Sequence, residues 1–210
     1  MHHAQNPRLF DGEVRTVEKT REIKILVLYD SIGGNTERVA KTIHEVALTA
    51  KLDSSLLKLT AATELNFNDY DVIFCGSPVI EWLPTTVMQS FIKAKLKEHR
   101  AKRDVLPCAP LKSGKFAVCF GTYCGAHIGV KEATPMTEWL AAFFWHIGYT
   151  VIDKLHLPGQ MRRPDIDKAI EQENNTEGLH GNIIGRPNQS DLETVKTHII
   201  GILRHIGALS

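Results

Sequence analysis

A turn of six residues, Ser31 to Thr36, lies between an apolar run and a helical pattern, and its residue types suit anion binding. The first N–H groups of a helix have no internal acceptor, and the helix dipole adds about half a positive charge there, so an anion is a natural occupant. Gly33 and Gly34 allow close backbone approach and positive φ. The side chains that can donate hydrogen bonds to phosphate oxygens are those of Ser31, Asn35 and Thr36.

The turn contains no lysine, and this absence narrows the expected ligand. Neither G-x-x-x-x-G-K-[ST] nor G-x-G-x-x-G occurs in the chain, which disfavours nucleoside triphosphates and dinucleotides bound through those motifs. Amides and hydroxyls alone favour a phosphate monoester that is held by hydrogen bonds without a paired cation. The alternative is an ordinary strand-to-helix turn with an asparagine cap.

Alternating strand and helix patterns must position this turn. Residues 25–29 before it form a β-branched and apolar run, as expected of a parallel strand that is buried on both faces. Further strands are expected at 55–59, on a sheet edge, and at 71–77, 115–122 and 149–153. Helices are expected from residue 35 or 36, from 83–84, after 130, at 164–173 and over 190–206, the last with an S-x-x-E capping box of Ser190 and Glu193. This order predicts a doubly wound α/β fold, a five-stranded parallel sheet with helices on both faces.

Length and composition set the domain organisation and exclude several classes of function. The 210 residues suit one domain, expected at 22–210, with an N-terminal tail or arm at 1–21. A formal net charge of +1 provides no argument for nucleic acid binding. The chain has no apolar run of about eighteen residues and no signal-peptide core, so we expect a cytoplasmic protein without membrane insertion.

The cysteines and histidines do not predict a metal site. The four cysteines, at positions 75, 108, 119 and 124, form no C-x-x-C motif, and the ten histidines are scattered without H-E-x-x-H. Cys75 and Cys119 fall inside expected strands and are predicted to be inert core thiols.

Two segments interrupt the alternation of strands and helices. Residues 93–103 form a basic run, interpreted as the solvated end of a helix, with docking of an acidic partner as the alternative. Residues 157–187 form an insertion before the C-terminal helix and are rich in proline, glycine and asparagine. Loops of this length are often lids, binding loops or interfaces, although a decorative insertion is equally compatible with the sequence.

Three expected strand ends together resemble those of flavodoxins and flavodoxin-like FMN-binding proteins. Residues 31–36, SIGGNT, resemble the phosphate loop [ST]-x-[TS]-G-N-T of that family, although Gly33 replaces a hydroxyl and removes one phosphate contact. GSPVIEW at 76–82 resembles the loop after the third strand, which lies along one face of the flavin. FGTYCGAHIG at 120–129 resembles the loop after the fourth strand, on the other face.

The resemblance implies the strand order 2-1-3-4-5 and FMN bound beyond the carboxyl ends of the strands. It places Trp82 and Tyr123 on opposite faces of the ring, the alternative being surface aromatics with packing roles. Cys124 is either a redox-sensitive thiol or incidental. The implied cofactor-binding residues are Ser31, Ile32, Gly33, Gly34, Asn35, Thr36, Ser77, Pro78, Val79, Ile80, Trp82, Gly121, Thr122, Tyr123, Cys124 and Gly125.

The resemblance predicts a redox protein that transfers electrons through FMN, and three versions stay open. The first is an electron carrier between partner proteins, although familiar carrier flavodoxins are acidic and this chain is nearly neutral. The second is an FMN-dependent NAD(P)H:quinone-type reductase with residues 157–187 in its substrate pocket, although no nicotinamide-binding motif is evident. The third is a flavin-free interaction module whose tail and insertion form a partner surface or a homo-oligomer interface. No catalytic residue is assigned.

Overall fold

The strands form one parallel sheet in the expected order. The computed structural model describes residues 23–209, so the tail predicted at 1–21 lies outside the described residues. The sheet has five strands in the order β2-β1-β3-β4-β5, which confirms the predicted fold class and places β2 at an edge. The strands are β1 (Lys24–Tyr29), β2 (Asp53–Lys58), β3 (Val72–Pro78), β4 (Phe116–Tyr123) and β5 (Thr150–Pro158).

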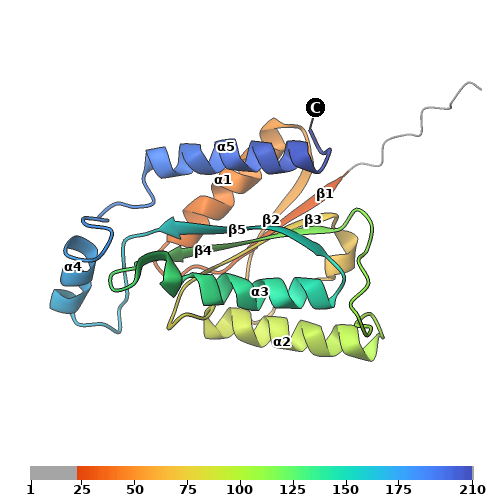
Figure 1. Cartoon of the computed structure of the whole chain (residues 1–210), viewed down its shortest axis with the longest axis horizontal. Coiled ribbons are helices and arrows are strands. Elements are labelled where there is room, and N and C mark those ends of the chain that lie inside the picture. The colour runs from red at the N-terminus through yellow and green to blue at the C-terminus, as the bar shows by residue number, and fades with distance from the viewer. Residues whose placement is uncertain (1–22, 210) are drawn as a thin grey trace, which may run out of the picture.

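Helices cover both faces of the sheet and one helix lies at its end (Figure 1). One face is covered by α1 (Asn35–Thr49) and α5 (Gln189–His205), and the other by α2 (Thr86–Ala101) and α3 (Thr134–His146). The short helix α4 (Lys168–Thr176) lies beyond the arrowheads of the strands, at the left of the view. Two 3₁₀ helices span Phe67–Asp69 and Gly129–Glu132.

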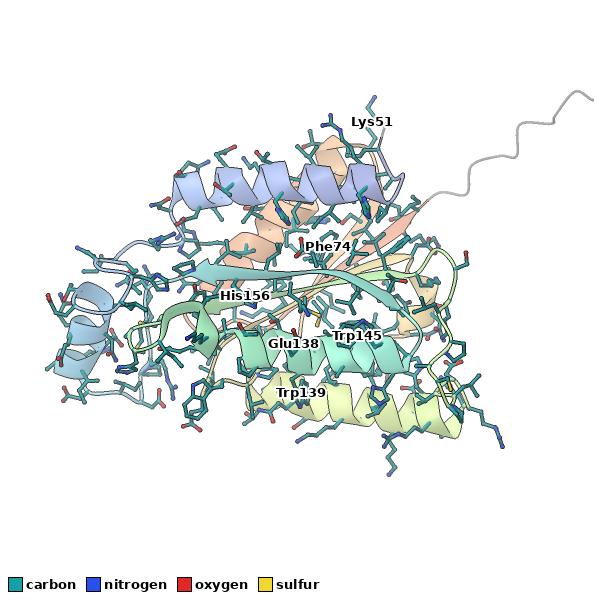
Figure 2. The ribbon with its side chains drawn as sticks, in the orientation of Figure 1. Lys51, Phe74, Glu138, Trp139, Trp145 and His156 are labelled. Atoms are coloured by element: carbon teal, nitrogen blue, oxygen red, sulfur yellow. The ribbon has the colours of Figure 1, made fainter. Side chains whose placement is uncertain are left out.

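The central strands are buried on both faces, as their apolar sequences predicted. In β1, Ile25 and Val27 point into the core under α1 and α5, whereas Leu26 and Leu28 point into the core under α2 and α3. Figure 2 shows Phe74 of β3 between the sheet and the α5 layer. A parallel sheet with helices on both faces requires this alternation, because each side chain of a central strand meets a helix.

The insertion starts later than the sequence indicated. β5 runs to Pro158 and stays paired with β4 as far as Tyr123, so the irregular segment begins at residue 159 instead of 157. The polar residues Asp153, Lys154 and His156 hid this part of the strand, because an edge strand need not be apolar throughout.

The capping box of α5 also lies elsewhere than predicted. The side chain of Asn188 accepts a hydrogen bond from the N–H of Asp191 at 3.1 Å, and the Asp191 carboxylate accepts one from the N–H of Asn188 at 2.7 Å. Ser190 and Glu193 lie inside the helix, so the predicted box was wrong. Arg186 forms an ion pair with Asp191 and thereby favours the earlier cap.

The two cysteines predicted in the core are buried there. Cys75 and Cys119 are register partners on β3 and β4. Burial raises the pKa of Cys75 to about 12 and raises that of Cys119 as well, so both thiols stay protonated at neutral pH. Within residues 23–209, no group of three histidine, cysteine or acidic side chains could hold a metal ion. In the same range, no helix has the length and apolar character needed to cross a bilayer.

A glycine in β3 makes room for an aromatic side chain in the core. A Cβ atom on Gly76 would lie 2.1 Å from the Phe120 ring, which has no exposed surface. We expect Gly76→Ala to lower the free energy of unfolding by about 1–3 kcal/mol, because the buried ring must move. Urea denaturation measures this change.

Gly201 provides the matched control. It lies on the exposed side of α5, and a Cβ atom added there would have no neighbouring atom within 4 Å, so Gly201→Ala is expected to raise stability by about 1 kcal/mol. Phe120→Leu should recover part of the loss caused by Gly76→Ala. Equal effects of the two alanine substitutions would contradict the packing argument.

Candidate functional site

A cavity of about 480 Å³ lies at the carboxyl ends of β1, β3 and β4. The loops that follow these three strands form most of its wall, and the segment between β5 and α4 completes it. In Figure 1 this is the end of the sheet beside α4. The residues that line the cavity are Ser31, Ile32, Gly33, Asn35, Thr36, Pro78, Val79, Ile80, Glu81, Trp82, Thr122, Tyr123, Cys124, His127, Ile128, Glu132, Gly159, Gln160, Met161, Arg162, Arg163, Ile166 and Asn174.

The turn between β1 and α1 presents free backbone donors to this cavity. Gly34 takes a φ of +87°, and the Ser31 hydroxyl accepts hydrogen bonds from the N–H groups of Gly34 and Glu37 at 3.2 and 3.3 Å. Within the described part of the chain, four other N–H groups of the turn have no acceptor: those of Ile32, Gly33, Asn35 and Thr36. Such a cluster at a helix N-terminus is suited to an anion.

Two side chains of the turn are tied to other elements. The Thr36 hydroxyl is hydrogen-bonded to that of Thr122, at the end of β4, with an oxygen–oxygen distance of 2.7 Å. Asn35 donates from Nδ2 to the carbonyl of Gln160 at 2.8 Å. Its Oδ1 atom is buried and has no partner among the described residues. A buried acceptor without a donor at a cavity wall is unusual, because most such atoms in proteins are hydrogen-bonded.

The buried carboxylate of Asp30 supports the turn through hydrogen bonds, and the sequence did not predict this role. Asp30 accepts hydrogen bonds from the N–H of Ser31 at 2.7 Å and from the Thr85 hydroxyl at 2.5 Å. The Thr85 hydroxyl also caps α2 by accepting from the N–H of Met88. The turn, the end of β3 and the start of α2 are therefore one connected unit. The available sequence signal was an acidic residue directly after a buried strand.

The loop after β3 ends in a tight turn with an unusual backbone. Ile80 and Leu83 exchange two backbone hydrogen bonds of 2.9 and 3.0 Å, with Glu81 and Trp82 between them. Their φ values are +50° and +67°, the pattern of a type I′ turn, which strongly favours asparagine and glycine. The Trp82 side chain lines the cavity and is 57% exposed. Strained backbone of this kind often occurs at functional sites.

The loop after β4 places Tyr123 and Cys124 under the insertion. The Tyr123 ring is buried and packs edge-on against His180, with 5.5 Å between ring centroids, and burial raises the pKa of its hydroxyl. The Cys124 thiol contacts the carbonyl of Asn174 at 3.5 Å. Burial raises the pKa of this thiol to about 11, so it is protonated at neutral pH and a weak nucleophile.

The structure brings most of the residues predicted for the site to one cavity. All line it except Gly34, Ser77, Gly121 and Gly125. The Ser77 hydroxyl donates to the carbonyl of Pro78 and accepts from the N–H of Thr85, so it is engaged within the protein. Gly121 and Gly125 leave space for Met136 and His180 respectively. Contact of any residue of the predicted site with a flavin stays a prediction.

The insertion contributes a part of the wall that the predicted site did not include. Residues 159–163, with Ile166 and Asn174, line the cavity, as do His127 and Glu132. Arg162 lies beside the turn and donates to the carbonyl of Gly33 at 3.4 Å. The residues of the turn alone did not indicate this neighbouring cation, and the expectation of a phosphate held without a paired cation stays a prediction. The only sequence signals were the length of the insertion and its Arg-Arg pair, neither of which names its spatial neighbour.

Comparisons with known proteins show the fold. No model of a protein family matches the sequence, and no curated protein matches it. Among solved structures, the chain is similar to a short-chain flavodoxin associated with a non-canonical PDU bacterial microcompartment, with a TM-score of 0.57 and 12% identity over 88% of this chain and 99% of that one. It is also similar to a WrbA-like flavodoxin from Agrobacterium tumefaciens, with a TM-score of 0.56 and 15% identity over 90% and 99% of the two chains.

An archaeal flavodoxin gives the same result, with a TM-score of 0.55 and 17% identity over 88% of this chain and 99% of that one. Structural similarity at these sequence identities establishes the fold alone, so the ligand has to be inferred from the residues of the site. The chain therefore has a flavodoxin-like fold, as the three strand-end motifs indicated.

The turn at Glu81 and Trp82 provides a direct test of stored backbone strain. We expect Trp82→Gly to raise the free energy of unfolding by about 1 kcal/mol, because glycine takes a positive φ without steric cost. Trp82→Ala is the control, since it also removes the exposed ring but keeps the strain. Urea denaturation that found the alanine variant as stable as the glycine variant would contradict the strain argument.

Proposed function

We propose that the cavity binds FMN and that the protein transfers electrons through it. The observation that carries the proposal is the cluster of four backbone N–H groups without acceptors in the described part of the chain, at the turn where three strand-end loops meet. A terminal phosphate satisfies such donors, as water would in its absence. The similar solved structures described as flavodoxins support the same cofactor.

The residues present fit the chemical groups of FMN. Residues 31–36 would hold the phosphate through main-chain N–H groups. Apolar side chains line the rest of the cavity and suit a flat ring, with Trp82 at its mouth. They are Ile32, Pro78, Val79, Ile80, Ile128, Met161 and Ile166.

Bound FMN would accept and donate one or two electrons, and the protein would set the electrostatics of the ring. Glu81 and Glu132 line the cavity, and Glu132 is already engaged through Oε1 by the N–H groups of His127 and Ile128. A carboxylate beside the ring disfavours added negative charge and thereby lowers the reduction potential. Trp82 lines the cavity and is half-exposed, so it would shield a bound ring from part of the solvent.

The first experiment measures binding to the purified protein. We expect FMN to bind about 100-fold more tightly than riboflavin, because riboflavin lacks the phosphate and leaves the donors of the turn unmatched. Quenching of flavin fluorescence gives both dissociation constants. Absence of FMN binding would overturn the proposal and favour the flavin-free interaction module.

A second candidate function, an FMN-dependent NAD(P)H:quinone-type reductase, is favoured by one feature of the cavity. Its wall continues beyond the three strand-end loops onto Met161, Ile166 and Asn174, which would provide polar and apolar surface beside a bound flavin. A small acceptor, such as a quinone, could use that surface. Partner proteins would instead approach the opening of the cavity near the exposed Trp82.

Steady-state turnover separates the two candidates. If the protein is an electron carrier, the FMN-loaded form should oxidise NADH or NADPH in the presence of a quinone no faster than the same concentration of free FMN. Rapid, saturable oxidation of either nucleotide would instead assign the reductase. Absorbance at the nicotinamide band measures the rate, with free FMN as the control.

A further inference from the structure

A short part of the insertion crosses the turn between β1 and α1. We call residues 159–163 the strap. The N–H of Gly159 donates to the carbonyl of Tyr123 at 2.8 Å, and the carbonyl of Gln160 accepts from Nδ2 of Asn35 at the same distance. These bonds hold the strap between the loop after β4 and the turn, so it forms a built part of the cavity wall.

The side chain of a buried asparagine fixes the next residue of the strap. Asn175 of α4 accepts from the N–H of Met161 at 2.7 Å and donates to the carbonyl of the same residue at 3.1 Å. Asn175 is 2% exposed. Because both backbone groups of Met161 are bound, the position of the following residue, Arg162, is set by the protein before any ligand enters.

Gly33 and Arg162 are in close contact, and the space between them favours glycine. A Cβ atom at position 33 would lie 3.0 Å from the Cβ of Arg162 and 3.3 Å from its carbonyl oxygen. Gly33 does not have a positive φ, so the preference for glycine comes from the approach of the strap and not from the backbone conformation of the turn. A larger residue here would push the strap away from the turn.

The Arg162 guanidinium has no carboxylate partner in the described part of the chain. It donates to Oε1 of Gln160 at 3.0 Å and to the carbonyl of Gly33 at 3.4 Å, both neutral acceptors. The other two arginines of residues 159–187 differ, since Arg163 is paired with Asp165 and Arg186 with Asp191. The hydrogen bond from the N–H of Arg163 and the ion pair with Lys168 lower the pKa of the Glu171 carboxylate, and the charge of Arg162 contributes less to that lowering. Arg162 therefore brings a positive charge without an ion pair to the turn that has free N–H donors.

We infer that Arg162 supplies a cationic contact to the phosphate of the ligand and that Gly33 is the residue that admits it. The inference rests on the proposed function and deepens it. Compared with the phosphate-loop pattern [ST]-x-[TS]-G-N-T, the turn lacks a hydroxyl at position 33, and the guanidinium of a distant segment lies there instead. A guanidinium forms stronger hydrogen bonds to phosphate than a hydroxyl does, and its effect is screened by salt. Binding at this site is accordingly selective for a dianionic ligand.

The test measures binding of FMN and riboflavin to wild-type protein and to Arg162→Gln. We expect the substitution to weaken FMN binding by roughly 10- to 100-fold and riboflavin binding by less than about 2-fold, because only FMN carries the phosphate. Arg162→Lys keeps the charge and should recover part of the loss. Arg204→Gln makes the same chemical change on the exposed last turn of α5 and should leave both dissociation constants unchanged.

Ionic strength and inorganic phosphate give readouts that do not depend on the flavin ring. The dissociation constant of riboflavin divided by that of FMN measures the selectivity for the phosphate. This ratio should fall with added salt in the wild-type protein and change less in Arg162→Gln. Inorganic phosphate should compete with FMN in the wild-type protein and compete more weakly in the variant. If Arg162→Gln weakened the binding of FMN and of riboflavin by the same factor, the inference about Arg162 would be overturned, but the proposal that the cavity binds FMN would stand. If the wild-type protein bound no FMN, the proposed function itself would be overturned.

Gly33→Ala tests the geometric half of the inference. The added methyl group should displace the strap and weaken FMN binding by roughly 10-fold in the wild-type background, but by much less in an Arg162→Gln background, since the cationic contact is already lost. Additive effects of the two substitutions would show that Gly33 and Arg162 act independently and would contradict the inference. Thermal denaturation of each variant checks that the fold is retained.

Discussion

Unsatisfied backbone donors at one strand-to-helix turn are the constraint on which the site depends. A helix that begins directly at the end of a central strand leaves several N–H groups facing outward, and here four of them meet a cavity and no protein acceptor within the described residues. The Ser31 hydroxyl satisfies two others and so holds the turn open. The surrounding loops can therefore be understood as the frame that keeps this donor cluster accessible.

That frame is rigid because it is hydrogen-bonded across elements. Asp30 joins the turn to the cap of α2 through Thr85, and Thr36 joins it to the end of β4 through Thr122. Both links are buried, where hydrogen bonds are strong and the loss of one partner is costly. The three strand ends consequently form one surface, which a ligand would meet already arranged.

The insertion completes this surface and changes its charge. Without it, the turn would offer amides and hydroxyls alone, which was the expectation from residues 31–36. The strap adds Arg162 beside Gly33, where the turn has no side chain of its own, and Asn175 holds the strap backbone in place. A segment that the sequence left open between a binding loop and a decorative insertion is thus a wall of the cavity, and it adds positive charge as well as bulk.

The sequence by itself determined the sheet and the edge at which the site lies. Apolar runs, small residues after them and helical spacing are local signals, and parallel strands bring their carboxyl ends together whatever the loops contain. It could not give the support from Asp30 or the contact of Gly33 with Arg162, whose hydrogen bond joins positions 129 residues apart. Such contacts were decided by the tertiary structure alone, because the path of an irregular loop depends on the surfaces it packs against and not on its own periodicity.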